Sequence, residues 1–280
     1  MSGNRKRTRH CGRYGVSAEH IQVSYFKYTE RGKRRGKKKR KKHQASTPKQ
    51  RNLNDKRSRR YFEALVLSNF KKNDLHVTVT YDDENKPADL KEAMRQVDNY
   101  IKRLNYTRGK KGLPPVKYVC VTEEGRNGRI HHHFVMDGEL DRDLVEKRWG
   151  KGYCNADRIQ PDRKKEIAPL IGYLCKDPKG RKRWTPSQNL IKPWDSINDD
   201  PRNMSSKKMS LMKDLPEDSE AMKQIIESDN PGYELVEVEK EYRKDTSQWY
   251  FFCRMKLKST GLFTKNKQLV DKKEKREKPT

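Results

Sequence analysis

The sequence predicts an α+β fold in which helices pack on an antiparallel sheet, and three observations support this prediction. First, the hydrophobic pattern of residues 56–159 changes repeatedly between steps of three or four residues and strict alternation. Second, after an initial helix the elements follow the order strand, helix, strand, strand, helix, strand, which is ferredoxin-like and shared by RRM-like domains. Third, the Asn127-Gly128 pair separates two alternating runs, as in a β-hairpin.

Each element has its own signal in the sequence. The helices carry apolar residues three or four positions apart, and Asp89 is expected to cap the second helix. The strands alternate apolar and polar residues and are rich in β-branched side chains. The expected helices are 56–70, 90–104, 140–149 and 166–176, with a weaker one at 221–227. The expected strands are 75–81, 116–122, 129–136 and 152–159, followed by a hairpin of 233–238 and 248–257.

The charge of the chain indicates a polyanionic partner. The net charge is +28, and most of the excess of Lys and Arg lies in residues 1–60. Nucleic acid is the commonest partner for a charge so concentrated. Hydrophobic residues make up only 31% of the chain against 38% charged residues, so part of the chain is expected to be tail or loop.

Three parts are expected along the chain. Residues 1–55 are predicted to be a disordered arm, because dense like charges repel one another. A nuclear-localisation signal is the alternative for the same residues. Residues 56–195 form the folded domain, and residues 196–280 form an extension with a weak helix, a hairpin and a charged tail. The arm residues expected to contact phosphates are Arg34, Arg35, Lys37, Lys38, Lys39, Arg40, Lys41 and Lys42.

Cysteine usage and hydropathy predict a soluble protein of a reducing compartment. The five cysteines are widely spaced and include no C-x-x-C pair, so neither a disulfide framework nor a zinc ribbon is indicated. The N-terminus lacks the apolar segment of a signal peptide, and no 18 apolar residues run together. We therefore expect a cytoplasmic protein with no membrane partner.

The most informative stretch is the expected strand 129–136, which contains three consecutive histidines. Because strand side chains alternate between faces, His131 and His133 share one face with Val135, and His132 lies on the other. Two imidazoles on one side of a rigid strand are suitably spaced to bind one divalent ion. The sequence therefore predicts a metal site on this face.

A carboxylate upstream is expected to complete the site, and the hairpin register decides which one. A two-residue turn at Asn127-Gly128 places Glu124 opposite His131 and Thr122 opposite His133. A loop of three or five residues, or a bulge, selects Glu123 instead. Parity for the two-residue turn favours Glu124 slightly, and both glutamates remain candidates. A mixed nitrogen and oxygen site with open positions suits Mg²⁺ or Mn²⁺ acting as a Lewis acid on a phosphodiester.

Tyr173 is the candidate nucleophile. It lies in the expected helix 166–176, whose apolar residues would dock the helix on the sheet. Lys176, three residues later, projects from the same helix face. A phenol can attack phosphorus to form a phosphotyrosine, and an ammonium group can neutralise the charge that develops.

At this point the motifs resemble a known family, the single-tyrosine HUH endonucleases that initiate rolling-circle replication. Three motifs carry the resemblance: VTEEG with GRIHHH at 121–133, YLCK at 173–176, and the strand LHVTVTY at 75–81 after Asn69-Phe70. The basic segment Lys182–Leu190 is similar to the one that follows the tyrosine in this family. The resemblance covers about residues 56–195. His132 departs from the family, which usually has an apolar residue there.

The resemblance implies an HUH endonuclease fold and a set of roles for these residues. His131 and His133 would bind the metal, with Glu123 or Glu124 as the acidic ligand. Tyr173 would be the nucleophile and Lys176 its partner. Basic residues expected to contact DNA within the domain are Arg129, Lys182 and Arg183.

The expected function is a replication initiator (Rep protein) of a phage, plasmid or other mobile element in a bacterial cell. It would nick single-stranded DNA at an origin or origin hairpin, retain the 5′ phosphate on tyrosine and later rejoin the strand. No Gly-x-x-x-x-Gly-Lys-Ser/Thr loop is present, so a host helicase and a host DNA polymerase are implied. The alternatives are a relaxase or single-tyrosine transposase with the same chemistry, and a non-enzymatic RRM-like nucleic-acid-binding protein.

Overall fold

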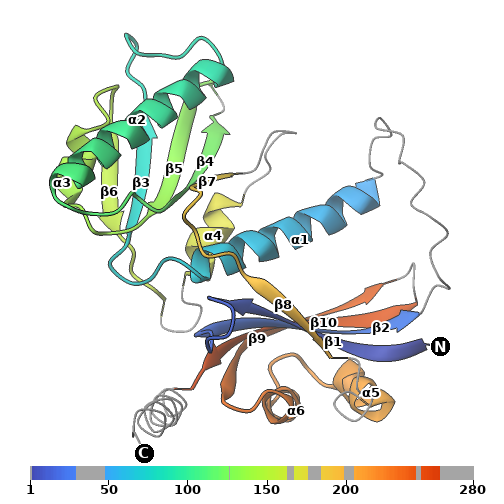
Figure 1. Ribbon diagram of the computed structural model, residues 1–280. Coiled ribbons are helices and arrows are strands. Elements are labelled where there is room, and N and C mark those ends of the chain that lie inside the picture. Colours follow the sequence, from blue (N-terminus) through green and yellow to red (C-terminus); the bar gives the residue numbers. More distant parts are fainter. Residues whose placement is uncertain are drawn as a thin grey trace, which may run out of the picture. The chain divides into compact units, whose positions relative to one another are not determined.

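The computed structural model describes residues 2–29, 48–125, 127–162, 167–175, 184–198, 205–243 and 247–258. The chain divides into two compact units. The central unit comprises Lys56–Lys192, and the terminal unit comprises Met1–Asp55 with Pro193–Thr280. Each unit contains a five-stranded antiparallel sheet with helices packed on it, so the fold class is α+β (Figure 1).

The central unit has the predicted order of elements. Its helices are α1 (Pro48–Leu67, of which residues 56–67 belong to this unit), α2 (Leu90–Lys110), α3 (Arg142–Lys147) and α4 (Ala168–Leu174). Its strands are β3 (Leu75–Thr80), β4 (Tyr118–Glu124), β5 (Ile130–Met136), β6 (Cys154–Arg158) and β7 (Thr185–Pro186). The sheet order is β6-β3-β5-β4-β7, in which β3 and β5 are neighbouring central strands.

The sheet of the central unit is apolar on one face. The even-numbered residues of β5, among them Phe134 and Met136, join the alternate residues Leu75, Val77 and Val79 of β3 in one buried cluster. Helices α2 and α3 cover this face (Figure 1). Asp89 caps α2 as expected, since its side chain accepts a hydrogen bond from the backbone N–H of Glu92.

The second face of the sheet is only partly covered by helices. Val119, Val121 and Val135 pack there against the C-terminal half of α1 and against α4. We expected helices on one face alone, and the structure shows them on both. The reason is that α4 and the end of α1 each carry an apolar stripe that has to be buried. The polar alternate residues of β3 and the odd-numbered histidines of β5 share this second face.

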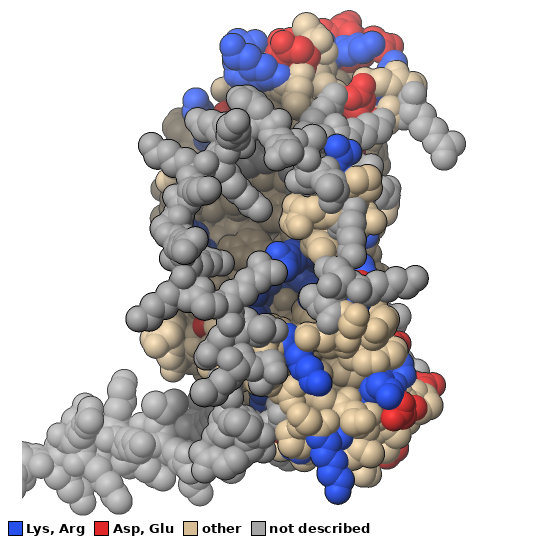
Figure 2. Space-filling model, turned by 90° about the vertical axis from the view of Figure 1, so that its right-hand side faces the viewer, with Lys and Arg blue, Asp and Glu red and all other residues tan. Residues whose placement is uncertain are grey.

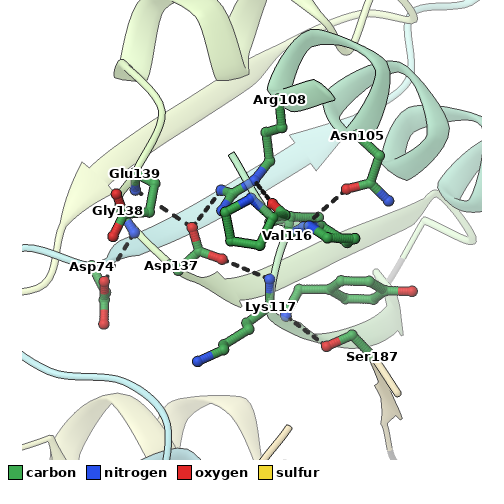
Figure 3. A network of polar contacts seen from close by, with 12 residues as sticks. Asp74, Asn105, Arg108, Val116, Lys117, Asp137, Gly138, Glu139 and Ser187 are labelled. Atoms are coloured by element: carbon green, nitrogen blue, oxygen red, sulfur yellow. Dashed lines mark hydrogen bonds and ion pairs between the residues drawn. The ribbon is translucent and has the colours of Figure 1, made fainter. Parts of the chain in front are cut away.

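A buried ion pair fixes one end of this sheet (Figure 3). Arg108, in the last turn of α2, is almost fully buried and pairs with Asp137, which follows β5, at 2.5 Å. Its Nε also donates to the carbonyl of Pro114. The second oxygen of Asp137 accepts from the backbone N–H of Lys117. One carboxylate therefore ties the end of α2 to the start of β4 and the end of β5.

The terminal unit is built from both ends of the chain. Its strands are β1 (Ser2–Cys11), β2 (His20–Thr29), β8 (Trp194–Asn198), β9 (Tyr233–Arg243) and β10 (Gln248–Leu257). Its helices, besides the start of α1, are α5 (Ser206–Asp214) and α6 (Glu220–Asp229). The sheet order is β8-β1-β2-β10-β9, so the C-terminal hairpin is not a separate extension but joins the N-terminal strands.

The prediction of a disordered arm over residues 1–55 is wrong for residues 2–29. Strand β2 contributes Ile21, Val23 and Tyr25 to a core that also contains residues of α5, α6 and β10. Strand β1 is basic, but alternation keeps Arg7 and Arg9 on the face away from this core, where both pair with Asp195. The dense block Arg34–Lys42 lies outside the described residues.

The described surface does not have a single sign of charge. Figure 2 shows Lys and Arg side chains interspersed with Asp and Glu side chains on the face in view. Much of the positive charge of the sequence belongs to segments that the structure does not describe, including residues 31–42. Among the described helices, none is both long enough and apolar enough to span a membrane.

The Arg108–Asp137 pair gives a test of the fold. Replacing Arg108 by Leu should lower the free energy of unfolding by about 3–5 kcal/mol, because Asp137 is left charged and buried without its partner. Chemical denaturation measures the change. The matched control is Arg95→Leu on the same helix, whose pair with Glu92 is exposed and should contribute less than about 1 kcal/mol. Equal losses in the two variants would contradict a structural role for the buried pair.

Candidate active site

The β4–β5 hairpin sets the register of the site. The backbone N–H of Gly125 donates to the carbonyl of Arg129, and the N–H of Gly128 donates to the carbonyl of Gly125. Gly128 has a φ of 74°, which is the left-handed conformation at the third position of a three-residue hairpin loop. The loop is therefore 126–128, and the two-residue turn that favoured Glu124 is wrong.

This register brings one glutamate together with two histidines. Glu123 lies opposite His131, and Val121 lies opposite His133. One ligand atom from each of Glu123, His131 and His133 lies within 4.8 Å of the others, a group that could hold a metal ion. Glu123 Oε2 is 3.5 Å from His131 Nε2. His133 is buried, whereas Glu123 and His131 are partly exposed, so the group opens to solvent on one side.

Glu124 and Thr122 lie on the other face of the sheet. Glu124 pairs with Ile130, and Thr122 pairs with His132. We expected Thr122 opposite His133, and this expectation fails for the same reason, the odd number of residues in the loop. Because strand side chains alternate, Glu124 does not take part in the Glu123, His131 and His133 group.

Thr78 orients His133. Its hydroxyl lies 3.1 Å from Nδ1 of His133, on the neighbouring strand β3. This contact engages Nδ1 and so assigns metal binding to Nε2. A second hydrogen bond of this kind fixes the ring orientation and the tautomer of a histidine that binds a metal. Sequence analysis placed Thr78 on the polar face of its strand but gave it no role.

His132 is a structural residue of the core. It is fully buried, with the Tyr81 hydroxyl 2.9 Å from Nε2 and the Thr122 hydroxyl 2.9 Å from Nδ1. Two hydroxyls satisfy a neutral imidazole, because each can donate or accept. Burial lowers the pKa of His132 to about 3, and the neighbouring His131 and His133 lower it further. This neutral side chain therefore takes the place of an apolar residue.

Tyr173 stands beside the second histidine of the group. Helix α4 places its ring 5.3 Å from the ring of His133, in an edge-on arrangement. The side chain is 45% exposed, although Ile171 and Leu174 of the same helix are buried against the sheet. The apolar face of a short helix thus holds the phenol next to the candidate ligands and leaves it accessible.

His76 is a further member of this region that sequence analysis did not assign. Its ring stacks on His133 at 5.6 Å between centroids and lies 6.4 Å from the ring of Tyr173. Burial lowers the pKa of His76, while the carboxylate of Asp157 opposes this shift. The alternation of residues 75–81 already placed His76 and Thr78 on one face, and that was the available signal.

Several predicted site residues cannot be placed. Arg129 is described, and it pairs with Asp83 in the loop after β3. The remaining residues lie outside the described residues: Lys176, Lys182, Arg183 and the basic block Arg34–Lys42. Their roles stay predictions.

Comparison with known proteins points to DNA replication. Residues 74–178 match the model of a family described as replication-associated protein ORF2. The matched segment runs from the residue before β3 to just beyond α4, so it contains the Glu123, His131 and His133 group and Tyr173. No curated protein and no solved structure matches the chain. The family match supports a relation to rolling-circle replication initiators, an endonuclease type of enzyme and DNA as the partner.

The contact between Thr78 and His133 gives a test of the metal group. Thr78→Val should weaken Mn²⁺ binding by about tenfold or more, because the orienting hydrogen bond is lost. Thr78→Ser, which keeps the hydroxyl, should bind Mn²⁺ as the wild type does. Titration calorimetry measures both affinities. Identical affinities in the three proteins would show that the hydroxyl does not support the site.

The buried His132 predicts a pH dependence of stability. The unfolded side chain protonates near pH 6.5, whereas the folded one stays neutral down to about pH 3. The unfolded state therefore binds more protons in this window, and the free energy of unfolding falls as the pH falls. The expected loss from His132 between pH 7 and pH 5 is about 2 kcal/mol.

Denaturation of wild type and His132→Gln at both pH values, with a chelator present, measures this contribution. The variant should be less stable at pH 7, but it should lose about 2 kcal/mol less than the wild type on going to pH 5. A loss of the same size in both proteins would contradict a neutral, buried His132.

Proposed function

We propose that the central unit is the nuclease domain of a replication initiator that nicks and rejoins single-stranded origin DNA through Tyr173. The observation that carries this proposal is the position of the Tyr173 ring, 5.3 Å from the ring of His133 in the Glu123, His131 and His133 group. A half-exposed phenol beside a group suited to a metal is the arrangement that phosphoryl transfer to tyrosine needs. The family match over residues 74–178 supports the same reaction class.

The donor set fits a divalent cation with open coordination positions. Two imidazole nitrogens and one carboxylate provide three ligands, and the partly exposed side of the group leaves room for a phosphate oxygen. We assign this cation to Mg²⁺ or Mn²⁺. Such an ion supplies Lewis-acid polarisation of the scissile phosphodiester.

In the proposed reaction Tyr173 is the only protein group that changes its bonds. Its oxygen forms a bond to phosphorus while the bond from phosphorus to the 3′ oxygen of the preceding nucleotide breaks. In the net reaction the phenol proton ends on the released 3′ hydroxyl. The 5′ phosphate stays on Tyr173 as a phosphodiester, so its bond energy is conserved and a later 3′ hydroxyl can reverse the step without ATP.

We assign supporting roles to residues beyond the described structure. Lys176, three positions after Tyr173, would neutralise charge on the phosphate. The basic block Arg34–Lys42, together with Lys182 and Arg183, would hold the DNA backbone. The released 3′ hydroxyl would serve a host polymerase, and a host helicase would separate the strands. A relaxase or a transposase would perform the same chemistry on another DNA.

A binding protein without activity is the less favoured alternative. RRM-like sheets that bind RNA carry exposed aromatic residues on the two central strands. In the central unit the open face of the neighbouring central strands β3 and β5 carries His76, Thr78, His131 and His133 instead. These side chains suit a cation and a phosphate better than stacked bases.

The nucleophile is tested with a randomised single-stranded DNA library and Mn²⁺. The wild type should form a covalent protein–DNA adduct, and sequencing of the attached strands gives the cleavage site. Tyr173→Phe should reduce adduct formation by at least about 10³-fold, because the attacking oxygen is removed.

The matched control is Tyr106→Phe, since Tyr106 is 63% exposed on α2 and keeps its ring in the variant. It should form the adduct as the wild type does. Calorimetry should find Mn²⁺ binding unchanged in Tyr173→Phe. An undiminished adduct in this variant would refute Tyr173 as the nucleophile.

A further inference from the structure

A cavity of about 320 Å³ lies beside the His131 end of the candidate active site. The end of β3 and the loop that follows it form one wall, and the β4–β5 hairpin forms the other. The lining residues used below are Asp82, Lys86, Pro87, Arg129, Ile130 and His131. None of the roles assigned above uses this cavity.

Tyr173 and the cavity lie at opposite ends of the metal group. The pairing of β3 with β5 sets His76 beside Val135, Thr78 beside His133 and Thr80 beside His131. Tyr173 contacts the His76 and His133 end of this row. The cavity is lined by Thr80 and His131 at the other end. A phosphate held by the Glu123, His131 and His133 group therefore has the phenol on one side and the cavity on the other.

The geometry of phosphoryl transfer gives the cavity a role. The attacking and leaving oxygens lie roughly in line on opposite sides of phosphorus. With Tyr173 attacking from the His133 side, the departing 3′ oxygen points toward the His131 side. We propose that the cavity binds the nucleotide on the 5′ side of the scissile phosphate, which carries this leaving oxygen. The inference rests on the proposed function of Tyr173 and extends it to substrate position.

The lining of the cavity suits one nucleotide. Its volume is at the lower end for ligand pockets, so there is room for a single nucleotide and not for a duplex. Pro87 and Ile130 supply apolar surface for a base or sugar, and Asp82 supplies a carboxylate that can accept from a base amino group. Lys86 supplies a positive charge for the phosphate on its far side.

Arg129 can exchange its present partner for that phosphate. Its guanidinium pairs with Asp83 at 2.5 Å, and the two side chains are 52% and 83% exposed. Exposed pairs of this kind contribute about 0–1 kcal/mol, so breaking one costs little. A phosphate accepts two parallel hydrogen bonds from a guanidinium and is the stronger partner.

The test uses the cleavage sequence recovered from the randomised library. Two modified oligonucleotides carry a three-carbon spacer in place of one nucleoside, either on the 5′ side or on the 3′ side of the nicked phosphate. Rates of adduct formation are compared for wild type, Lys86→Ala and Lys91→Ala. Lys91 is exposed nearby on α2 but does not line the cavity, so its variant is the matched control.

With wild type, the spacer on the 5′ side should lower kcat/KM by about tenfold or more, as expected for loss of a bound base. Lys86→Ala should lower kcat/KM on the intact oligonucleotide and respond less to the 5′ spacer, since the two changes remove one shared interaction. It should respond to the 3′ spacer as wild type does. Lys91→Ala should match the wild type throughout.

Three outcomes would overturn the inference. Coupling of Lys86 to the 3′ spacer would place the opposite nucleotide in the cavity. Coupling to neither spacer would show that the cavity does not bind the nucleotide next to the phosphate. Absence of any Tyr173-dependent adduct from the library is a separate result, because it refutes the proposed function itself and the inference with it.

Discussion

The central unit depends on the burial of His132 between the hydroxyls of Tyr81 and Thr122. An imidazole is costly to bury unless both ring nitrogens have partners, and here the two neighbouring strands supply one each. A slip of β5 by one residue would expose His132 and bury His131 and His133 with no such partners. The middle histidine thus holds the strand in the register that presents the outer two on the open face.

Helix α4 adds the second requirement, which is a reactive side chain that is held in place without being buried. Ile171 and Leu174 anchor this short helix to the sheet, and Tyr173 between them remains half exposed beside His133. The apolar contacts and the reactive group therefore belong to different faces of one helix. The site combines a ligand row fixed by strand pairing with a phenol fixed by helix packing.

Sequence patterns were sufficient for features that depend on local periodicity. The alternation of residues 75–81 and 130–136 predicted which side chains share a face, and the apolar steps of α2 predicted that helix and its cap. The loop between β4 and β5 was mispredicted because Asn-Gly occurs both in two-residue turns and, as here, at the last two positions of a three-residue loop. The strands β1 and β2 were missed because their charged residues dominate the local composition. Their partners β8 and β10 lie far away in the sequence.

The two adjacent glutamates at the end of β4 have a consequence for how this hairpin can vary. If the loop lost or gained one residue, Glu124 would move opposite His131, and a carboxylate would still face the histidines. Val119 and Val121 would, however, exchange faces with Cys120 and Thr122, and both apolar clusters would lose their contacts with β4. The length of this loop is therefore constrained by the hydrophobic core, whereas the acidic ligand is duplicated. Natural variation in loop length should appear together with compensating changes along β4, and not with loss of the acidic pair.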